Sequence, residues 1–314
     1  MKSLGKICFV LLCIAAVTVV IGRVGLRSES GTDKVSVSEK LTEEAGNLLE
    51  SAGALVGELV NGYKGFEGYD IEEATMFDEA YPIWEGDLVQ KLELGEAASL
   101  EIELGGCIME LLASESGEAQ LIAENMGKLQ VYQQEETLYI RGTRKALEDA
   151  AQCRLQLYLP AEHLWKSAEL EIGAGSVTAA GLQAEQLRLT TGAGQIMAEG
   201  LCAERLEVSV GAGEINISEM NAGALQGEVG VGTLKLQGSI REKVEANCSV
   251  GNLTLEVTGA QEDYNYELSG VLGKIMLGGK HYSEKVEELT IDNGADRYMD
   301  LNCSVGNVVV TFSE

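Results

Sequence analysis

The sequence of 314 residues predicts an all-β domain, a β-solenoid-like stack of 19-residue strand-turn-strand repeats. An N-terminal transmembrane helix and a juxtamembrane amphipathic helix are expected before it. Three observations predict this organisation. An apolar run lies near the start of the chain, short runs that alternate apolar with polar residues begin near residue 100, and pairs of glycines recur at a fixed spacing.

Residues 1–27 are predicted to form a signal anchor or transmembrane helix. Two lysines precede an apolar run over residues 7–22, which is near the short end for a spanning helix. A cleaved signal peptide is the alternative, but no small-x-small cleavage site directly follows the run. A buried soluble helix is a third possibility. Leu12 before Cys13 argues against lipidation. An uncleaved anchor with its basic end inside is the preferred interpretation.

Residues 28–87 are expected to hold a polar tether, an amphipathic helix over about 36–61 and an irregular connector. Apolar residues recur at helical spacing between Leu41 and Val60. Ser36 and Glu39 form a possible capping box. The polar face is rich in Glu rather than Lys, which disfavours binding to a membrane surface. The apolar face is therefore expected to pack on the downstream domain or on a second copy.

The strand region is predicted over 88–314, as one elongated β domain. Its first strands are expected near 100–112, 128–132, 137–142 and 153–160, where apolar and polar residues alternate. Glycine pairs then recur every 19 residues, with a serine replacing the first glycine of the fifth pair. The predicted structural glycines are Gly173, Gly175, Gly192, Gly194, Gly211, Gly213, Gly230, Gly232 and Gly251.

Apolar positions keep the same 19-residue register as the glycines. Two residues after each pair come Val177, Ile196, Ile215, Leu234 and Leu253. A bend or bulge at the glycines allows the strands on both sides of the corner to face one interior. Such a unit has no closed core alone, so we expect the units to stack. The sequence does not decide between a solenoid and a two-sheet sandwich, nor the handedness of the coil.

The period loosens after residue 258. Residues 263–277 restart the pattern at a longer spacing and residues 297–312 close it. The pentapeptide CSVGN occurs twice, beginning at Cys248 and at Cys303, so both cysteines are expected at equivalent inward positions. No C-x-x-C motif occurs. The cysteines beyond the N-terminal segment are therefore expected to be buried free thiols.

The sequence predicts no catalytic, cofactor or metal site. The glycine corners lead into strands and lack the lysine of a phosphate loop, and they lack the Asp of calcium-binding repeats. No G-x-S-x-G nucleophile elbow occurs. His163 and His281 have no metal-ligand neighbours in sequence, so loop or surface positions are expected. Loose calcium binding by surface carboxylates stays open.

Acidic and aromatic residues leave two alternatives open. The acids Glu171, Glu199, Glu207 and Glu228 alternate with apolar residues, as a solvated face does, although carboxylate pairs for glycoside hydrolysis stay possible. Trp84 and Trp165 flank the first part of the strand region. Each either covers an open end of the stack or stacks on a carbohydrate.

Several segments carry a family resemblance. They are LEIELGG near the domain start, LQLYLP before the repeats, the first two GAG units, DYNYELSG and the closing CSVGNVVVTF. Over about 88–314 the chain resembles the bacterial putative-adhesin family of β-strand-repeat domains of unknown function, common in Gram-positive cell envelopes. The resemblance implies a β-solenoid-like fold outside the membrane and no catalytic residues.

The net charge of −27 excludes nucleic acid as an expected partner and favours cationic ones. We predict a non-catalytic, single-pass protein of the bacterial cell membrane with its C-terminal domain outside, in adhesion, binding or envelope-stress sensing. The ligand would be an unknown protein or glycan, and a homo-oligomer is possible. The alternatives are a polysaccharide-processing enzyme on a β-helix scaffold and a self-associating structural surface module.

Overall fold

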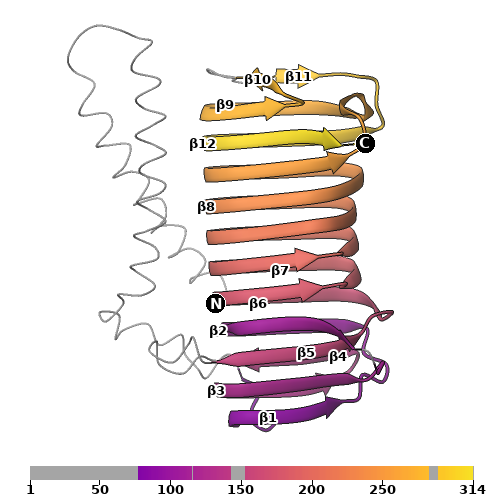
Figure 1. Ribbon diagram of the computed structural model, residues 1–314, viewed down its shortest axis with the longest axis vertical. Helices are drawn as coiled ribbons and strands as arrows, with labels where there is room; N and C mark the ends of the chain where they lie inside the picture. The colour runs from indigo at the N-terminus through magenta and orange to yellow at the C-terminus, as the bar shows by residue number, and fades with distance from the viewer. Residues whose placement is uncertain (1–76, 115, 143–152, 283–288, 314) are drawn as a thin grey trace, which may run out of the picture. The chain divides into compact units, whose positions relative to one another are not determined.

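The computed structural model describes residues 77–114, 116–142, 153–282 and 289–313 (Figure 1). The described residues are almost entirely strand, which confirms the all-β prediction. The strands are β1 (Trp84–Leu92), β2 (Ser99–Ser114), β3 (Ala119–Gln134), β4 (Thr137–Gly142), β5 (Arg154–Pro160), β6 (Leu164–Ala180), β7 (Gln183–Glu199), β8 (Cys202–Thr258), β9 (Tyr264–Leu277), β10 (Lys280–Tyr282), β11 (Leu289–Ile291) and β12 (Arg297–Ser313). A 3-10 turn over Gln261–Asp263 precedes β9.

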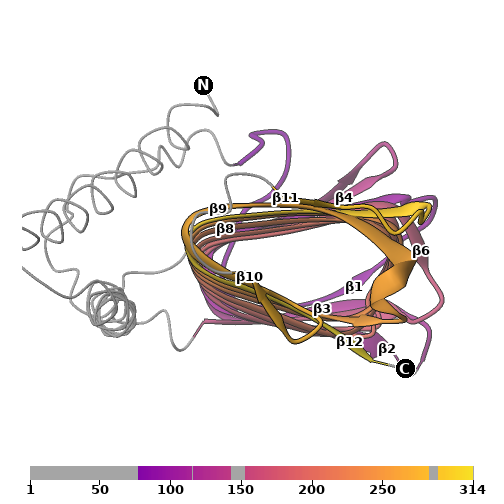
Figure 2. The ribbon, with the colours of Figure 1, turned by 90° about the horizontal axis from the view of Figure 1, so that it is seen from above.

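Successive coils stack in parallel with a shift of 19 residues. Leu164 of β6 pairs with Gln183 of β7, which pairs with Cys202 of β8. The strand β8 continues through further corners as one 57-residue element. All twelve strands belong to one hydrogen-bonded sheet, and Figure 2 shows that it curves into two facing layers. The chain is therefore a solenoid rather than a sandwich of two separate sheets.

The predicted apolar columns line the interior. Val177, Ile196, Ile215 and Leu234 are fully buried, and the first three are in register on neighbouring coils. The polar residues that alternate with them face solvent. Because the in-register ladder repeats each coil on the one before it, a 19-residue sequence period becomes a continuous apolar core.

The C-terminal coils are not stacked in sequence order. The strand β12 pairs in parallel with the last part of β8 on one side and with β9 on the other. It therefore lies between two strands that precede it in the chain (Figure 1). The short strands β10 and β11 pair antiparallel with β9 at this end. The sequence predicted that β12 closes the series but not that it is inserted beneath β9.

The N-terminal end is a mixed sheet in the order β1-β3-β4-β2, followed by β6. Antiparallel pairs join β3 to β1, β4 and β5, whereas β2 pairs in parallel with β4, β5 and β6. The fully buried Gln130 of β3 fixes the segment before β1. Its side chain accepts a hydrogen bond from Asp78 N and donates to the carbonyl oxygens of Asp78 and Tyr81.

The second glycine of each corner lies where two backbones come closest. A Cβ at Gly213, Gly232 or Gly251 would overlap the carbonyl oxygen of the equivalent glycine one coil below. The first position is more permissive, because Ser249 and Ser304 occupy it in the later coils. The glycine is needed at the second position because no side chain fits between the coils there.

The helices expected over residues 1–27 and about 36–61 lie outside the described residues. Within the described ranges, the structure has no helix with the length and apolar character needed to span a bilayer.

We predict that Gly232→Ala destabilises the domain more than Gly230→Ala, although both add one methyl group. A Cβ at position 232 would overlap the Gly213 carbonyl oxygen, whereas at position 230 it would lie 2.7 Å from the Gly211 carbonyl oxygen. The expected loss for Gly232→Ala is about 2 kcal/mol or more, because backbone atoms have to move. Urea unfolding of the full chain measures both, and equal midpoints would contradict the assignment.

Candidate binding surfaces

Outward side chains form columns because the coils are in register. In one column Glu169 of β6, Arg188 of β7 and Glu207 of β8 are successive neighbours. Arg188 contacts both carboxylates, with Nε 2.8 Å from Glu207 Oε2 and a terminal nitrogen 3.5 Å from Glu169 Oε1. The hydrogen bond to Glu207 is the largest cause of a raised pKa of Arg188. This part of the column is internally compensated.

The same column becomes acidic toward the C-terminal end. Asp300 of β12 lies between Glu245 of β8 and Glu267 of β9, in register with both. Partial burial, followed by the charges of Glu267 and Glu245, raises the pKa of Asp300. A hydrogen bond that Asn302 Nδ2 donates to Asp300 Oδ1, 2.9 Å long, acts in the opposite direction. Three carboxylates therefore lie on three adjacent strands.

Two neighbouring side chains contact this acidic column. Lys243 Nζ lies 2.6 Å from Glu245 Oε1, and the Tyr298 hydroxyl donates a hydrogen bond to Glu267 Oε2. That hydrogen bond is the largest of the causes that raise the pKa of Tyr298 to about 12. Lys243 supplies one positive charge beside three carboxylates, so the column keeps a net negative charge at neutral pH.

A cluster of tyrosines and one arginine lies near the N-terminal end. The rings of Tyr81 and Tyr132 stack with centroids 4.0 Å apart, and those of Tyr132 and Tyr139 with centroids 4.9 Å apart. The Arg141 guanidinium lies 5.0 Å from the centroid of the Tyr139 ring and 3.0 Å from Glu101 Oε1. Tyrosine and arginine are enriched at protein interfaces, which makes this cluster a candidate contact surface.

An open hollow lies where the β3–β4 hairpin meets the start of β6. Its lining holds two acids and one lysine within a polar set: Ser99, Glu135, Glu136, Thr137, Lys166, Ser167 and Gln186. The enzyme alternative called for three or more acids and a basic residue in one groove, and this hollow has one acid fewer. In the described ranges, no group of three or more His, Cys, Asp and Glu side chains is placed to hold a metal ion.

The structure separates the two tryptophans that the sequence singled out. Trp165 is buried in the core, with its ring 4.3 Å from that of His163, so it presents no face to a carbohydrate. His163 Nε2 lies 3.0 Å from the carbonyl oxygen of Ala97. Trp84 begins β1 and is 45% exposed. His281 is exposed on β10, apart from His163.

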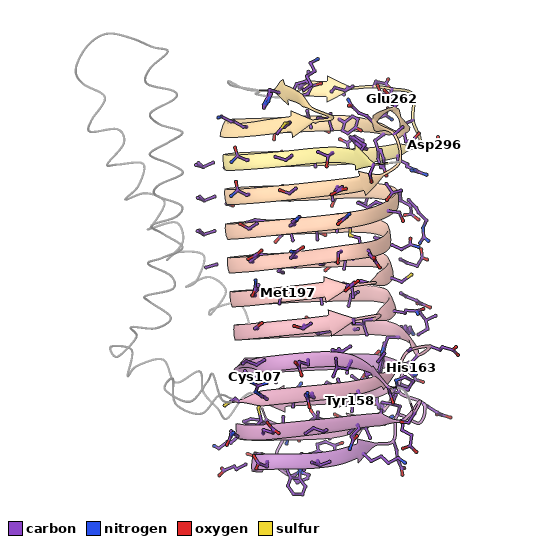
Figure 3. The ribbon with its side chains drawn as sticks, viewed as in Figure 1. Cys107, Tyr158, His163, Met197, Glu262 and Asp296 are labelled. Atoms are coloured by element: carbon purple, nitrogen blue, oxygen red, sulfur yellow. The ribbon has the colours of Figure 1, made fainter. Side chains whose placement is uncertain are left out.

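The acids named from the sequence lie on the outer face, Glu171, Glu199 and Glu228 exposed and Glu207 half-buried. Figure 3 shows Met197 on the strand face, and Glu262 and Asp296 at the strand ends beside the connections. Sequence reasoning missed the tyrosine cluster and the acidic column through Asp300. The signal for the tyrosines was their alternation with apolar residues in β3 and β4, but which rings meet depends on strand pairing.

We predict that Asp300→Asn stabilises the protein at neutral pH, by about 0.5 kcal/mol for relief of cross-strand repulsion. Because the pKa of Asp300 is raised on folding, the folded state holds this proton more tightly. Stability is therefore lost as pH rises through the interval above the ordinary carboxyl pKa. Urea midpoints at pH 3 and pH 7 should differ between variant and parent only at pH 7.

The matched control for Asp300→Asn is Glu256→Gln, which removes an acid that is paired with Thr311 of β12. Asparagine at position 300 keeps the oxygen that accepts the hydrogen bond from Asn302. A fall in stability at pH 7 for Asp300→Asn, or an equal gain for the control, would contradict the role given to the acidic column.

Comparison with known proteins was made on this basis. The family model of Toastrack DUF4097 matches residues 109–277 and 165–311. No curated protein matches the chain. A solved structure of a putative cell adhesion protein from Clostridium sporogenes is 12% identical, with 72% of this chain and 99% of that chain covered and a TM-score of 0.34.

Two further solved structures are similar at the same level. A putative adhesin from Bacteroides fragilis is 14% identical, with 71% of this chain and 96% of that chain covered and a TM-score of 0.36. A putative lipid binding protein from Parabacteroides distasonis is 11% identical, with 73% and 97% covered and a TM-score of 0.31. Because the family model matches well over half of the residues, this chain belongs to the Toastrack DUF4097 family.

Proposed function

We propose that the chain is a non-catalytic binding protein of the bacterial cell envelope. In this proposal the N-terminal segment anchors it in the membrane and the β-solenoid lies outside. The observation that carries the proposal is the register of the outward side chains, which aligns polar and acidic groups along the length of the stack. Solenoids with such extended faces suit contact with an elongated partner over several coils.

The charge of the surface favours a cationic partner. The chain has a net charge of −27, and Glu171, Glu199 and Glu228 project from the strand faces. A polypeptide segment rich in Lys or Arg would relieve repulsion among these carboxylates, whereas anionic polymers would be repelled. The proposed ligand class is therefore a cationic peptide or a basic segment of a protein.

We predict that a lysine decapeptide binds the full chain in detergent micelles and that binding weakens as salt concentration rises. The triple variant Glu171→Gln, Glu199→Gln and Glu228→Gln should weaken binding about tenfold, because three exposed charges leave the strand faces. Isothermal titration calorimetry at two salt concentrations measures the change.

The matched control neutralises three exposed acids outside the long strand faces, with Glu93→Gln, Glu262→Gln and Asp296→Asn. It removes the same charge, so an equal loss of affinity in both variants would show a general charge effect and contradict a role of the strand faces. Failure of the parent chain to bind the peptide would contradict the cationic partner itself.

A second candidate function is self-association through the free edge of the sheet. Within the described part, β1 pairs only with β3, so its other edge carries unpaired backbone groups. Ile83, Trp84 and Val89 are 45%, 45% and 67% exposed at this edge. Exposed apolar residues on an unpaired edge strand favour addition of a strand from another chain.

We predict that Val89→Lys lowers any self-association of the full chain, because a charged edge strand resists pairing. Sedimentation equilibrium in detergent micelles over a range of concentrations measures the change, with at least a fivefold rise in the dissociation constant expected. Met197→Lys is the matched control, since Met197 is 41% exposed on the central strand β7. A monomeric parent, or an equal effect of both variants, would eliminate this candidate.

A further inference from the structure

Four of the five cysteines in the described ranges lie as two pairs on neighbouring strands. Cys248 of β8 and Cys303 of β12 are directly in register and are 3% and 2% exposed. Cys107 of β2 and Cys153 stand one residue before the in-register pair Ile108 and Arg154. The carbonyl oxygen of Cys153 accepts a hydrogen bond from Ile108 N at 2.9 Å, which fixes this alignment.

The distances between the paired strands suit a covalent link. Neighbouring strands lie about 4.8 Å apart, and disulfides join Cα atoms that are about 4.4–6.8 Å apart. The side chains of Cys248 and Cys303 are hydrogen-bonded to each other, which raises the pKa of Cys248 and lowers that of Cys303. Two sulfur atoms in contact within the core need only a small movement to bond.

Both pairs join strands that are not successive coils of the chain. Between Cys248 and Cys303 the chain forms β9, β10 and β11 before β12 returns beside β8. Between Cys107 and Cys153 it forms β3 and β4 before β5 returns beside β2. These are the positions where chain connectivity holds neighbouring strands together least, so a cross-link there removes the most freedom from the unfolded chain.

We propose that Cys248 with Cys303, and Cys107 with Cys153, form two cross-strand disulfides when the chain folds in the presence of a small-molecule disulfide oxidant. For each link, two thiols lose two protons and two electrons and one S–S bond forms. The oxidant, in the class of oxidised glutathione, loses its own S–S bond and takes up the electrons and protons as two thiols. The inference does not depend on the proposed binding function.

Burial determines when the links form. Burial and the neighbouring Cys153 raise the pKa of Cys107 to about 12, so little thiolate is present once the core has closed. Exchange therefore proceeds while the returning strands dock and slows in the folded, reduced protein. Cys202, which is half-buried at the start of β8 opposite Gln183 and has no cysteine at its paired position, provides an internal reference.

The five cysteines lie in different tryptic peptides, 92–128, 146–154, 189–205, 244–274 and 298–314. The full chain is refolded in detergent micelles with oxidised and reduced glutathione, its free thiols are alkylated, and the unreduced digest is analysed by mass spectrometry. We expect 244–274 linked to 298–314 and 92–128 linked to 146–154, both lost after reduction, with 189–205 alkylated. Alkylation of all five peptides, or links that involve 189–205, would overturn the proposal.

Variants make the test specific to each pair. Cys303→Ser should abolish only the link between 244–274 and 298–314, and Cys202→Ser should leave both links in place. The urea midpoint of the oxidised parent should fall when a reductant is added, and this fall should be smaller for the double variant Cys248→Ser and Cys303→Ser. If reduction lowers the midpoint equally in parent and double variant, the Cys248–Cys303 link is excluded.

Discussion

The close approach of neighbouring backbones at the second corner glycine is the constraint on which the structure depends. At Gly213, Gly232 and Gly251 the coil below leaves no space for even a methyl group. Since the coils meet this tightly at one point, their hydrogen-bonded ladders keep one register along the strands on both sides of the corner. That register aligns the apolar side chains inside and the polar side chains outside.

The alignment has opposite effects on the two faces of the sheet. Inside, it places Ile196 against Ile215 and produces an uninterrupted core. Outside, it places charged groups one strand apart whatever their sign. Arg188 between two glutamates gives a compensated ladder, whereas Asp300 between two glutamates concentrates negative charge. The outer surface therefore has an electrostatic pattern that is fixed by the same repeat as the core.

Much of the fold could be predicted because the 19-residue period is a local property of the sequence. Val177 and Ile196 could be assigned to one column from spacing alone, and both are buried there. The place of β12 could not be predicted in the same way. The repeated CSVGN segment indicates that Cys248 and Cys303 are equivalent, but equivalence does not say which strand lies between which. That choice depends on pairing between segments 55 residues apart.

The candidate surfaces were less predictable than the core for a related reason. Alternation shows that Tyr132 and Tyr139 lie on one strand face or the other, yet their stacking depends on the antiparallel pairing of β3 with β4. Trp165 shows the converse limit. Its position before the regular repeats was compatible with an exposed cover or a ligand contact, and only its packing beside His163 assigns it to the core.

The insertion of β12 has a consequence for synthesis of the chain. A ribosome makes β9 before β12, so β9 emerges without the strand on which it will rest. The upper rung stays unsupported until nearly the last residue has been translated. A chain that terminates early would therefore lose a rung from within the ladder and leave β9 without its neighbour. Completion of the C-terminus acts as the keystone of this end of the molecule.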